Sequence, residues 1–399
     1  MTAASTPTQT ESAPAAPKHT RSAIPVQTRS ERFSSTEVAD FPEVTGREAM
    51  WKYTPVARLT ELTAGELDGS PYGYDATALP GVTTSWIGRD DARIGAAGKP
   101  EDRASANAWT NFERALLVSI AAGDGDAAHR EVTLHRSRLG GPARAAHTVV
   151  EVAAGARATL ILQNDGPAHL AENVEFLLAA GADLTVVSVQ EWDDDALHVA
   201  AHFAELGEGA RLKHVAVTLG GGVVRLNPSA HLAGARSQVE LFGAYFADAS
   251  QHLEQQVYVH HDGPETRSRV TYKGALQGQG ARTVWIGDVL IGPTAVGTDS
   301  YEQNRNLVLT DGARADSVPN LEIETGDIVG AGHASATGRF DDEQLFYLQS
   351  RGIPEEEARR LVVRGFLFEI VQQIGSPALQ EHLQAAIEAE LTLSVTAVA

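Results

Sequence analysis

The sequence contains no cysteine, little lysine and no long apolar run. Without cysteine, the chain forms no disulfide, offers no thiolate nucleophile and builds no all-thiolate zinc or iron-sulfur site by itself. Its apolar runs are shorter than the roughly 18 residues of a membrane span, and its amino-terminal segment lacks the apolar core of a secretory signal. We therefore expect a cytoplasmic protein with no membrane partner.

The charge balance is strongly acidic, with 32 Lys and Arg against 52 Asp and Glu and a formal net charge of −20. A surface with this average field repels polyphosphates, so nucleic acid is not an expected partner. None of the lysines follows a phosphate-binding glycine loop, and the glycines at 220–222 lack the strand and helix flanks of such a loop. We therefore expect no ATP site in this chain.

The amino-terminal third divides into an arm and a mixed region. Residues 1–40 are mostly Ala, Ser, Thr and Pro. Ordering them would cost entropy that no burial offsets, so we expect a disordered arm. A transit peptide is the alternative, although the acidic residues of the arm are unusual for one. Residues 41–127 are expected to form an N-terminal helical or mixed domain, in which Phe112, Leu116 and Leu117 approach helical spacing.

Residues 128–340 consist of short β-rich runs separated by glycine-containing turns. A Gly-Ala phrase recurs there at intervals of 26, 28, 25, 46 and 32 residues, which fits stacked repeats better than a sandwich of hairpins. Glycine permits a tight corner, and the alanine after it would point into a narrow interior. We expect a parallel β-helix, with an ordinary β-sandwich as the alternative. The phrase begins at Gly155, Gly181, Gly209, Gly234, Gly280 and Gly312.

Residues 341–399 return to helical periodicity and are expected to form a C-terminal helical domain. A first helix would end near Gly352, and Pro354, with three glutamates after it, fits the start of a second. A third helix would follow the next glycine and proline. Apolar side chains occupy nearly every face of residues 361–374, which predicts that part of this helix contacts a partner.

The leading candidate for chemistry is His333, which lies among small residues in GAGHASATGR. A bulky partner can approach its imidazole, which suits iron and carries protons near neutral pH. Upstream, Glu322 and Glu324 would share one face of a strand. A histidine that closes a turn through backbone hydrogen bonds is the competing interpretation. The adjacent His260 and His261 should point to opposite faces of a strand and so cannot chelate one ion together.

A resemblance to a known family rests on three stretches: HHDGPETRSRVTYKGALQGQGARTVWIGDVLI from His260, TDSYEQNRNLVLTDGARADSVPNLEIETGDI from Thr298, and GHASATGRFDDEQLFYLQSRGI from Gly332. Over roughly 100 residues they closely resemble the core of the SufB/SufD family of iron-sulfur cluster assembly scaffolds. The WKYT segment at Trp51 resembles the amino-terminal region of this family. SufB proteins carry cysteines that receive sulfur, so the absence of cysteine favours the SufD branch.

The resemblance implies a mainly β protein, with a right-handed parallel β-helix core flanked by N-terminal and C-terminal helical domains. It also implies a SufBCD complex with a SufB-type partner and the ATPase SufC, in which a nascent iron-sulfur cluster forms at the boundary between the SufB and SufD subunits. His333 aligns with the histidine implicated at that boundary, and Ala331 stands where many relatives have a cysteine. Reduced flavin (FADH2) is associated with some complexes of the family.

The expected function is therefore a non-catalytic scaffold subunit for iron-sulfur cluster assembly. His333 is the expected ligand of iron or of the nascent cluster, with Glu322 and Glu324 as further candidates. Two alternatives are open: a polysaccharide-active β-helix enzyme, and a purely structural partner of SufB whose histidine binds nothing. The C-terminal helices are expected to dock SufC through Leu345, Phe346, Leu361, Val362, Phe366, Leu367, Phe368 and Ile370.

Overall fold

The structure is a computed structural model that describes residues 32–123, 129–137, 139–339 and 342–396. Most of the arm expected at residues 1–40 thus lies outside the described residues. Strands account for 49% of the chain and helices for 18%, which makes the protein mainly β as predicted. Among the described residues, no helix has the length and apolar character needed to cross a membrane.

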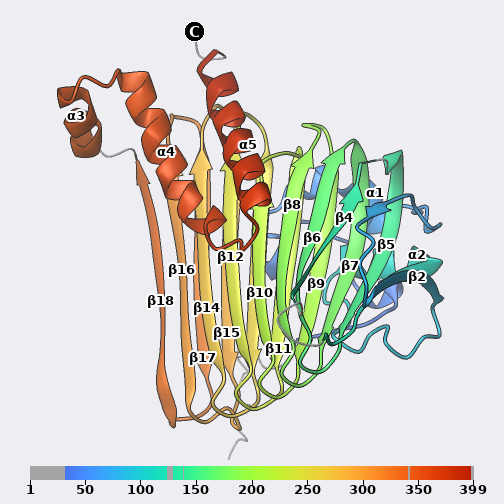
Figure 1. Cartoon of the computed structure of the whole chain (residues 1–399). Helices are drawn as coiled ribbons and strands as arrows, with labels where there is room; N and C mark the ends of the chain where they lie inside the picture. Colours follow the sequence, from blue (N-terminus) through green and yellow to red (C-terminus); the bar gives the residue numbers. More distant parts are fainter. Residues whose placement is uncertain (1–31, 124–128, 138, 340–341, 397–399) are drawn as a thin grey trace, which may run out of the picture.

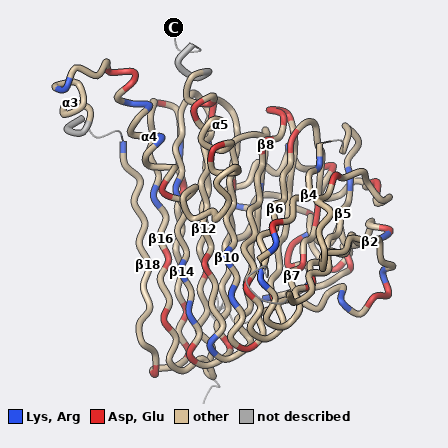
Figure 2. The backbone as a smooth tube through the Cα atoms, viewed as in Figure 1, with Lys and Arg blue, Asp and Glu red and all other residues tan. Residues whose placement is uncertain are grey.

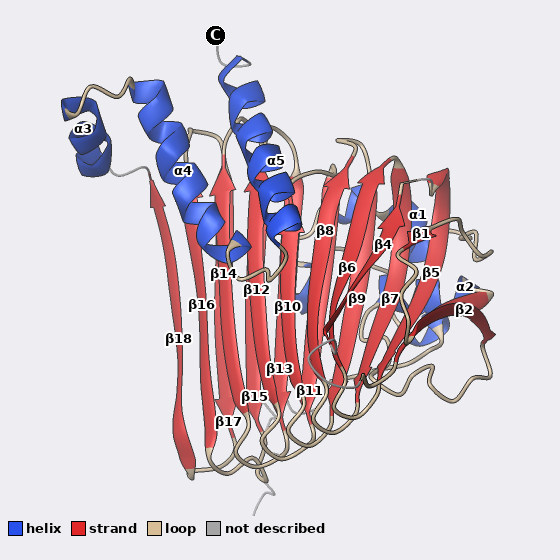
Figure 3. Cartoon of the chain, in the orientation of Figure 1, coloured by secondary structure: helices blue, strands red, loops and turns tan. Residues whose placement is uncertain are grey.

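The strands form two nine-stranded sheets, and the chain alternates between them as a β-solenoid of about eight turns (Figures 1 and 3). Sheet A contains β2 (Val82–Gly88), β3 (Arg114–Ile120), β5 (Gly140–Val152), β7 (Ala168–Leu178), β9 (Leu197–Leu206), β11 (Val223–Leu232), β13 (His252–His261), β15 (Arg282–Ile291) and β17 (Arg314–Ile323). Sheet B contains β1 (Asp75–Ala76), β4 (His129–Arg136), β6 (Arg157–Gly166), β8 (Asp183–Trp192), β10 (Arg211–Thr218), β12 (Gln238–Ala247), β14 (Arg267–Leu276), β16 (Thr298–Val308) and β18 (Ile328–Arg339).

Neighbouring strands pair in parallel in both sheets, from β3 onward in sheet A and from β4 onward in sheet B. Parallel neighbours cannot be joined by tight hairpins, because the chain must cross over between them. This pairing confirms the predicted parallel β-helix and excludes the β-sandwich.

The tight corners of the solenoid explain the Gly-Ala phrase. Gly155, Gly181 and Gly209 have φ angles of 69°, 67° and 62°, a region that side chains with a Cβ rarely adopt. The alanines that follow them are fully buried in the interior. At the equivalent corners after β11 and β13, Arg236 and Glu265 adopt the positive φ instead. The phrase at Gly234 lies in the corner after β11, whereas those at Gly280 and Gly312 lie at the opposite edge of the solenoid, which explains the irregular intervals.

The amino-terminal elements precede and cover the first coils. They are the short 3-10 helices η1 (Val38–Asp40), η2 (Ala49–Trp51) and η3 (Val56–Arg58), and the α-helices α1 (Thr60–Ala64) and α2 (Arg103–Asn111). Asp102 caps α2, because its side chain accepts a hydrogen bond of 2.9 Å from the backbone N–H of Ser105.

The helical spacing predicted through Leu116 and Leu117 is wrong, because α2 ends before them and both lie in strand β3. Leu116 packs in the interior between the sheets, whereas Leu117 packs under the amino-terminal helices. A strand buried on both faces shows a continuous apolar run rather than alternation, and such a run imitates helical spacing over a short window.

Three helices follow the last strand, as the sequence predicts: α3 (Asp342–Ser350), α4 (Glu355–Val371) and α5 (Pro377–Thr396). Helices α4 and α5 lie across the outer face of sheet B (Figure 1). Val363, Leu367 and Ile370 of α4 are buried there, in one cluster with Val217 and Phe246 of the sheet. The chain's own sheet therefore covers much of the apolar surface that predicted a partner on this helix.

The two ends of the solenoid differ. At the amino-terminal end, both sheets finish in a strand that pairs antiparallel with its neighbour, β1 with β4 and β2 with β3. At the carboxyl-terminal end, they finish in the parallel strands β17 and β18, each with one edge that pairs with no described strand. This end of the interior is also more exposed, because no further coil covers it.

Candidate functional site

His333 lies in the middle of β18, the last strand of sheet B. Ala331 and Ser335, two residues before and after His333, point to the same side of the strand as its ring and show which way it faces. Ala331 packs against the main core, and the hydroxyl of Ser335 lies 2.9 Å from that of Ser317 on β17. Alternation along the strand therefore turns His333 toward the interior. The ring is nevertheless exposed, because the solenoid ends here.

The turn-closing interpretation of His333 does not fit this position. The residue pairs within a regular parallel ladder, opposite Glu302 of β16. Among the described residues, its ring takes part in no hydrogen bond or ion pair. The imidazole is thus available to a ligand or a partner.

Glu302 is the buried residue directly under His333. Its exposed fraction is 1%, and neither of its carboxyl oxygens has a hydrogen-bond partner among the described residues. Burial, followed by the charge of Asp288, raises the pKa of Glu302 to about 8. The peptide N–H of Asn320 opposes this pKa shift, but it makes no hydrogen bond of ordinary geometry with the carboxyl.

Another buried interior carboxylate of the solenoid is fully paired. Arg136 holds the two oxygens of Glu172 with its two terminal nitrogens, at 2.6 and 2.9 Å, and His198 lies 2.8 Å from one of them. These partners hold the pKa of Glu172 well below its ordinary value, although burial alone would raise it. Glu302 has the same degree of burial without such partners, which singles it out.

The two other candidate ligands do not join His333. Leu321 packs against the interior, so alternation along β17 turns Glu322 to the outer face of sheet A. Glu324 follows the end of that strand and is exposed. In the described part of the chain, no three His, Asp or Glu side chains converge as a metal site.

The residues expected to dock SufC differ in their accessibility. Leu345, Leu367 and Ile370 are buried within the chain, with exposed fractions of 6%, 0% and 1%. Phe346 of α3 is 73% exposed, and its neighbour Tyr347 is 56% exposed. The remaining candidates are partly buried; they are Leu361, Val362, Phe366 and Phe368.

The adjacent histidines point to opposite faces of β13, as predicted. His260 stacks on the ring of His231 on the outer face, with ring centroids 4.8 Å apart. His261 is buried inside, where its ring nitrogens lie 2.8 Å from the hydroxyls of Thr266 and Ser268. Burial is the main cause that lowers the pKa of both histidines.

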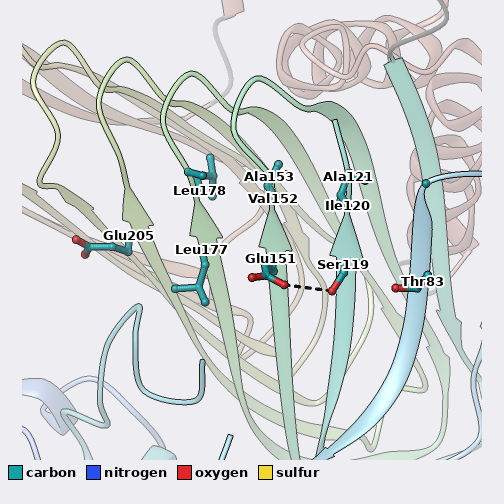
Figure 4. A pocket seen from close by; sticks show the side chains of 12 residues that line it. Thr83, Ser119, Ile120, Ala121, Glu151, Val152, Ala153, Leu177, Leu178 and Glu205 are labelled. Atoms are coloured by element: carbon teal, nitrogen blue, oxygen red, sulfur yellow. Dashed lines mark hydrogen bonds between the residues drawn. The ribbon is translucent and has the colours of Figure 1, made fainter. Parts of the chain in front are cut away.

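An open groove of about 600 Å³ lies on the outer face of sheet A, near the amino-terminal end of the solenoid (Figure 4). Ser119, Glu151, Leu177 and Glu205 cross it in register on neighbouring strands. Glu151 accepts hydrogen bonds from Ser119 and Arg93, at 3.3 and 3.1 Å. The lining contains two carboxylates, those of Glu151 and Glu205, and Arg93 pairs with the first of them.

Glu302 does not stand out in the sequence. Its strand reads TDSYEQNRNLV, in which polar residues fall on both faces, so no hydrophobic alternation separates interior from exterior positions. What points to Glu302 is its position opposite His333 in the pairing of β16 with β18, and this position is known only once the register of the two strands is known.

Comparison with known proteins gives the family. Residues 135–366 match the family model described as SUF system FeS cluster assembly, SufBD core domain. The chain belongs to the SufBD family. An iron-sulfur cluster assembly SufBD family protein of Mycobacterium bovis is 48% identical over 377 residues, which cover 92% of this chain and 94% of that protein.

Two further SufBD relatives bear on the branch and on the partner. The iron-sulfur cluster assembly protein SufD of Escherichia coli is 27% identical over 377 residues, covering 86% of this chain and 88% of that protein. A second SufBD family protein of Mycobacterium bovis is 28% identical over 201 residues, covering 50% of this chain and 24% of that protein. One organism can thus hold two different SufBD proteins.

Proposed function

We propose that this chain is a non-catalytic, cytoplasmic scaffold subunit for iron-sulfur cluster assembly, which pairs through its terminal coil with a SufB-type subunit. The observation that carries the proposal is the free edge of β18, with His333 at its centre. In this proposal, iron or the nascent cluster is bound at the boundary between the two subunits. In the absence of cysteine, any thiolate ligand must come from the partner, and any sulfide from the cluster itself.

The β18 edge is built for pairing. Soluble proteins usually protect a free edge with charged side chains, proline or a short strand. β18 is 12 residues long, contains no proline, and carries no charged residue before Arg339 at its end. Figure 2 shows the same strand tan along its length, whereas the neighbouring strands carry charges. Exposed apolar side chains lie at this end as well, with Val329 76% and Ile323 45% exposed.

We further propose that a SufC-type ATPase docks on the C-terminal helices. Phe346 and Tyr347 are large, exposed and adjacent on α3, which packs against α4. Exposed aromatic side chains of this size are typical anchors of protein interfaces. Because α4 is itself packed on sheet B, a partner held there would be connected to the solenoid. Reduced flavin is proposed for the complex as a whole, without a residue of this chain to bind it.

The test is coexpression with a SufB-type paralogue and the ATPase, followed by affinity purification and assays of iron and acid-labile sulfide. Val329→Lys places a charge on the β18 edge and should reduce recovery of the paralogue at least 10-fold. Ala76→Lys, on exposed strand β1 at the other end, is the matched control and should leave recovery unchanged. Equal recovery with both variants would place the interface elsewhere.

His333→Ala separates a ligand from a purely structural partner. We expect the variant complex to assemble and to lose most of its iron, because an exposed imidazole contributes nothing to folding here. A fully assembled complex with unchanged iron would support the purely structural alternative.

A further inference from the structure

We propose that Glu302 is the second protein ligand of the ion held by His333, so that the open end of the interior forms a carboxylate–imidazole site for ferrous iron. The inference rests on the proposed function of His333 and adds a ligand from the neighbouring strand. Its basis is the placement of the two side chains and the unsatisfied state of the buried carboxyl group.

The register places the two residues side by side. Glu302 and His333 are direct partners in the parallel ladder between β16 and β18. Direct partners of parallel strands project from the same face of the sheet. Both belong to interior rows, Glu302 by its burial and His333 by its alternation with Ala331 and Ser335.

A glycine on the facing sheet makes room for the carboxyl group. Gly287 of β15 lies opposite, and a Cβ atom there would be 2.4 Å from the Oε2 atom of Glu302 and 2.3 Å from the ring of Trp285. A larger residue would displace the carboxyl group, the ring or both. The absence of a side chain at this position therefore leaves space for the carboxyl group beside the Trp285 ring.

A structural role does not account for the carboxyl group. Buried polar atoms in proteins almost always have a hydrogen-bond partner, and each exception calls for an explanation such as a missing ion or water. Two other fully buried carboxylates, Glu172 and Glu175, accept hydrogen bonds from named side chains or backbone N–H groups. Both oxygens of Glu302 have none among the described residues. A cation would supply the missing interaction.

The chemistry of the pair suits ferrous iron. Imidazole nitrogen and carboxylate oxygen are common ligands of iron(II) in proteins, where the same two groups recur in sites with open positions. The pair supplies two ligands, and the remaining positions fall to water or to the partner across the β18 edge. The interior row of β16 that contains Glu302 also carries the polar residues Ser300, Asn304 and Asn306, which favours water over apolar packing at this end.

The test is anaerobic titration of the full-length chain with Fe²⁺ alone, in competition with a chromogenic chelator. We expect one ion per chain, with affinity lowered at least 10-fold by Glu302→Gln and to a similar extent by His333→Ala, since even outer-shell partners of a metal contribute 10- to 100-fold. Asp299→Asn is the matched control, because this carboxylate lies on the same strand and pairs with Arg269 on the outer face. Circular dichroism checks that each variant is folded.

The outcomes separate this inference from the proposed function. Loss of affinity with His333→Ala but not with Glu302→Gln overturns the role of Glu302 and leaves the histidine ligand in place. Unchanged affinity with both variants, or weak binding of Fe²⁺ by the unmodified chain, overturns the two-residue site. Similar losses with both, and none with Asp299→Asn, support it.

Discussion

The buried histidines His202 and His214 predict how acid destabilises the solenoid. Their rings lie in the interior, with Nδ1 of His202 2.9 Å from Nε2 of His214, and their exposed fractions are 2% and 1%. Burial lowers the pKa of His214 to about 4. Burial, followed by the charge of His214, lowers the pKa of His202 well below its ordinary value.

The direction of the pH effect follows from these shifts. Between about pH 6.5 and pH 4, an unfolded histidine binds a proton that the folded His214 does not bind, so the stability of the fold decreases as the pH falls through this window. From pH 8 to pH 5, His214 alone should remove about 2 kcal/mol from the free energy of unfolding. His202 adds to the loss in the same direction.

Urea unfolding at pH 8 and pH 5 measures this effect. The double variant His202→Leu/His214→Leu removes both titrations, so the unmodified chain should lose at least about 2 kcal/mol more than the variant on acidification. Leu212→Ala, on the same strand as His214, is the control: its cavity should cost about 2–5 kcal/mol at both pH values. Equal acid losses in the unmodified chain and the double variant would refute the reasoning.

Three other variants test the fold. Arg136→Met leaves the carboxylate of Glu172 buried and without its main partner, so urea unfolding should show a loss of about 3–5 kcal/mol, and a loss below about 1 kcal/mol contradicts the pairing. Gly243→Ala places a Cβ 2.1 Å from the ring of Tyr272, so it should cost about 1–3 kcal/mol, whereas an unchanged midpoint contradicts this close packing. Leu367→Asp buries a charge between α4 and sheet B, which should release the C-terminal helices from the sheet. Limited proteolysis should then cut these helices first, while the strand signal in circular dichroism persists. Simultaneous loss of the helices and of the strand signal would contradict the idea that the helices dock on an independently folded solenoid.

The sequence predicts the solenoid because its corners have a local chemical cause. Gly155, Gly181 and Gly209 are needed for the positive φ angles of one edge, and the repeat of this phrase is visible without any knowledge of pairing. The corner at Arg236 carries the phrase displaced, from Gly234, and the corner at Glu265 carries no such phrase, because residues with a Cβ take the positive φ at both. The coil count could therefore not be read from the glycines alone.

The candidate site was only partly predictable. His333 stands out by resemblance and by its small neighbours, but its interior orientation depends on the register between β16 and β18. Glu302 is recognisable only from burial and from the absence of partners, and both are properties of the folded interior. Local sequence likewise does not show that Glu322 faces away, since that depends on which face of β17 packs inside.

The unlike ends of the solenoid limit how many molecules can join. A rod with matching parallel edges at both ends would add copies indefinitely, because every addition regenerates the same docking edge, and the product would be a fibre. Here the antiparallel strands β1 and β2 finish the far end, so a molecule joined at β17 and β18 presents no new parallel edge. The proposed assembly through this edge would therefore stop at two rods, and cargo held at their junction would be enclosed once per pair.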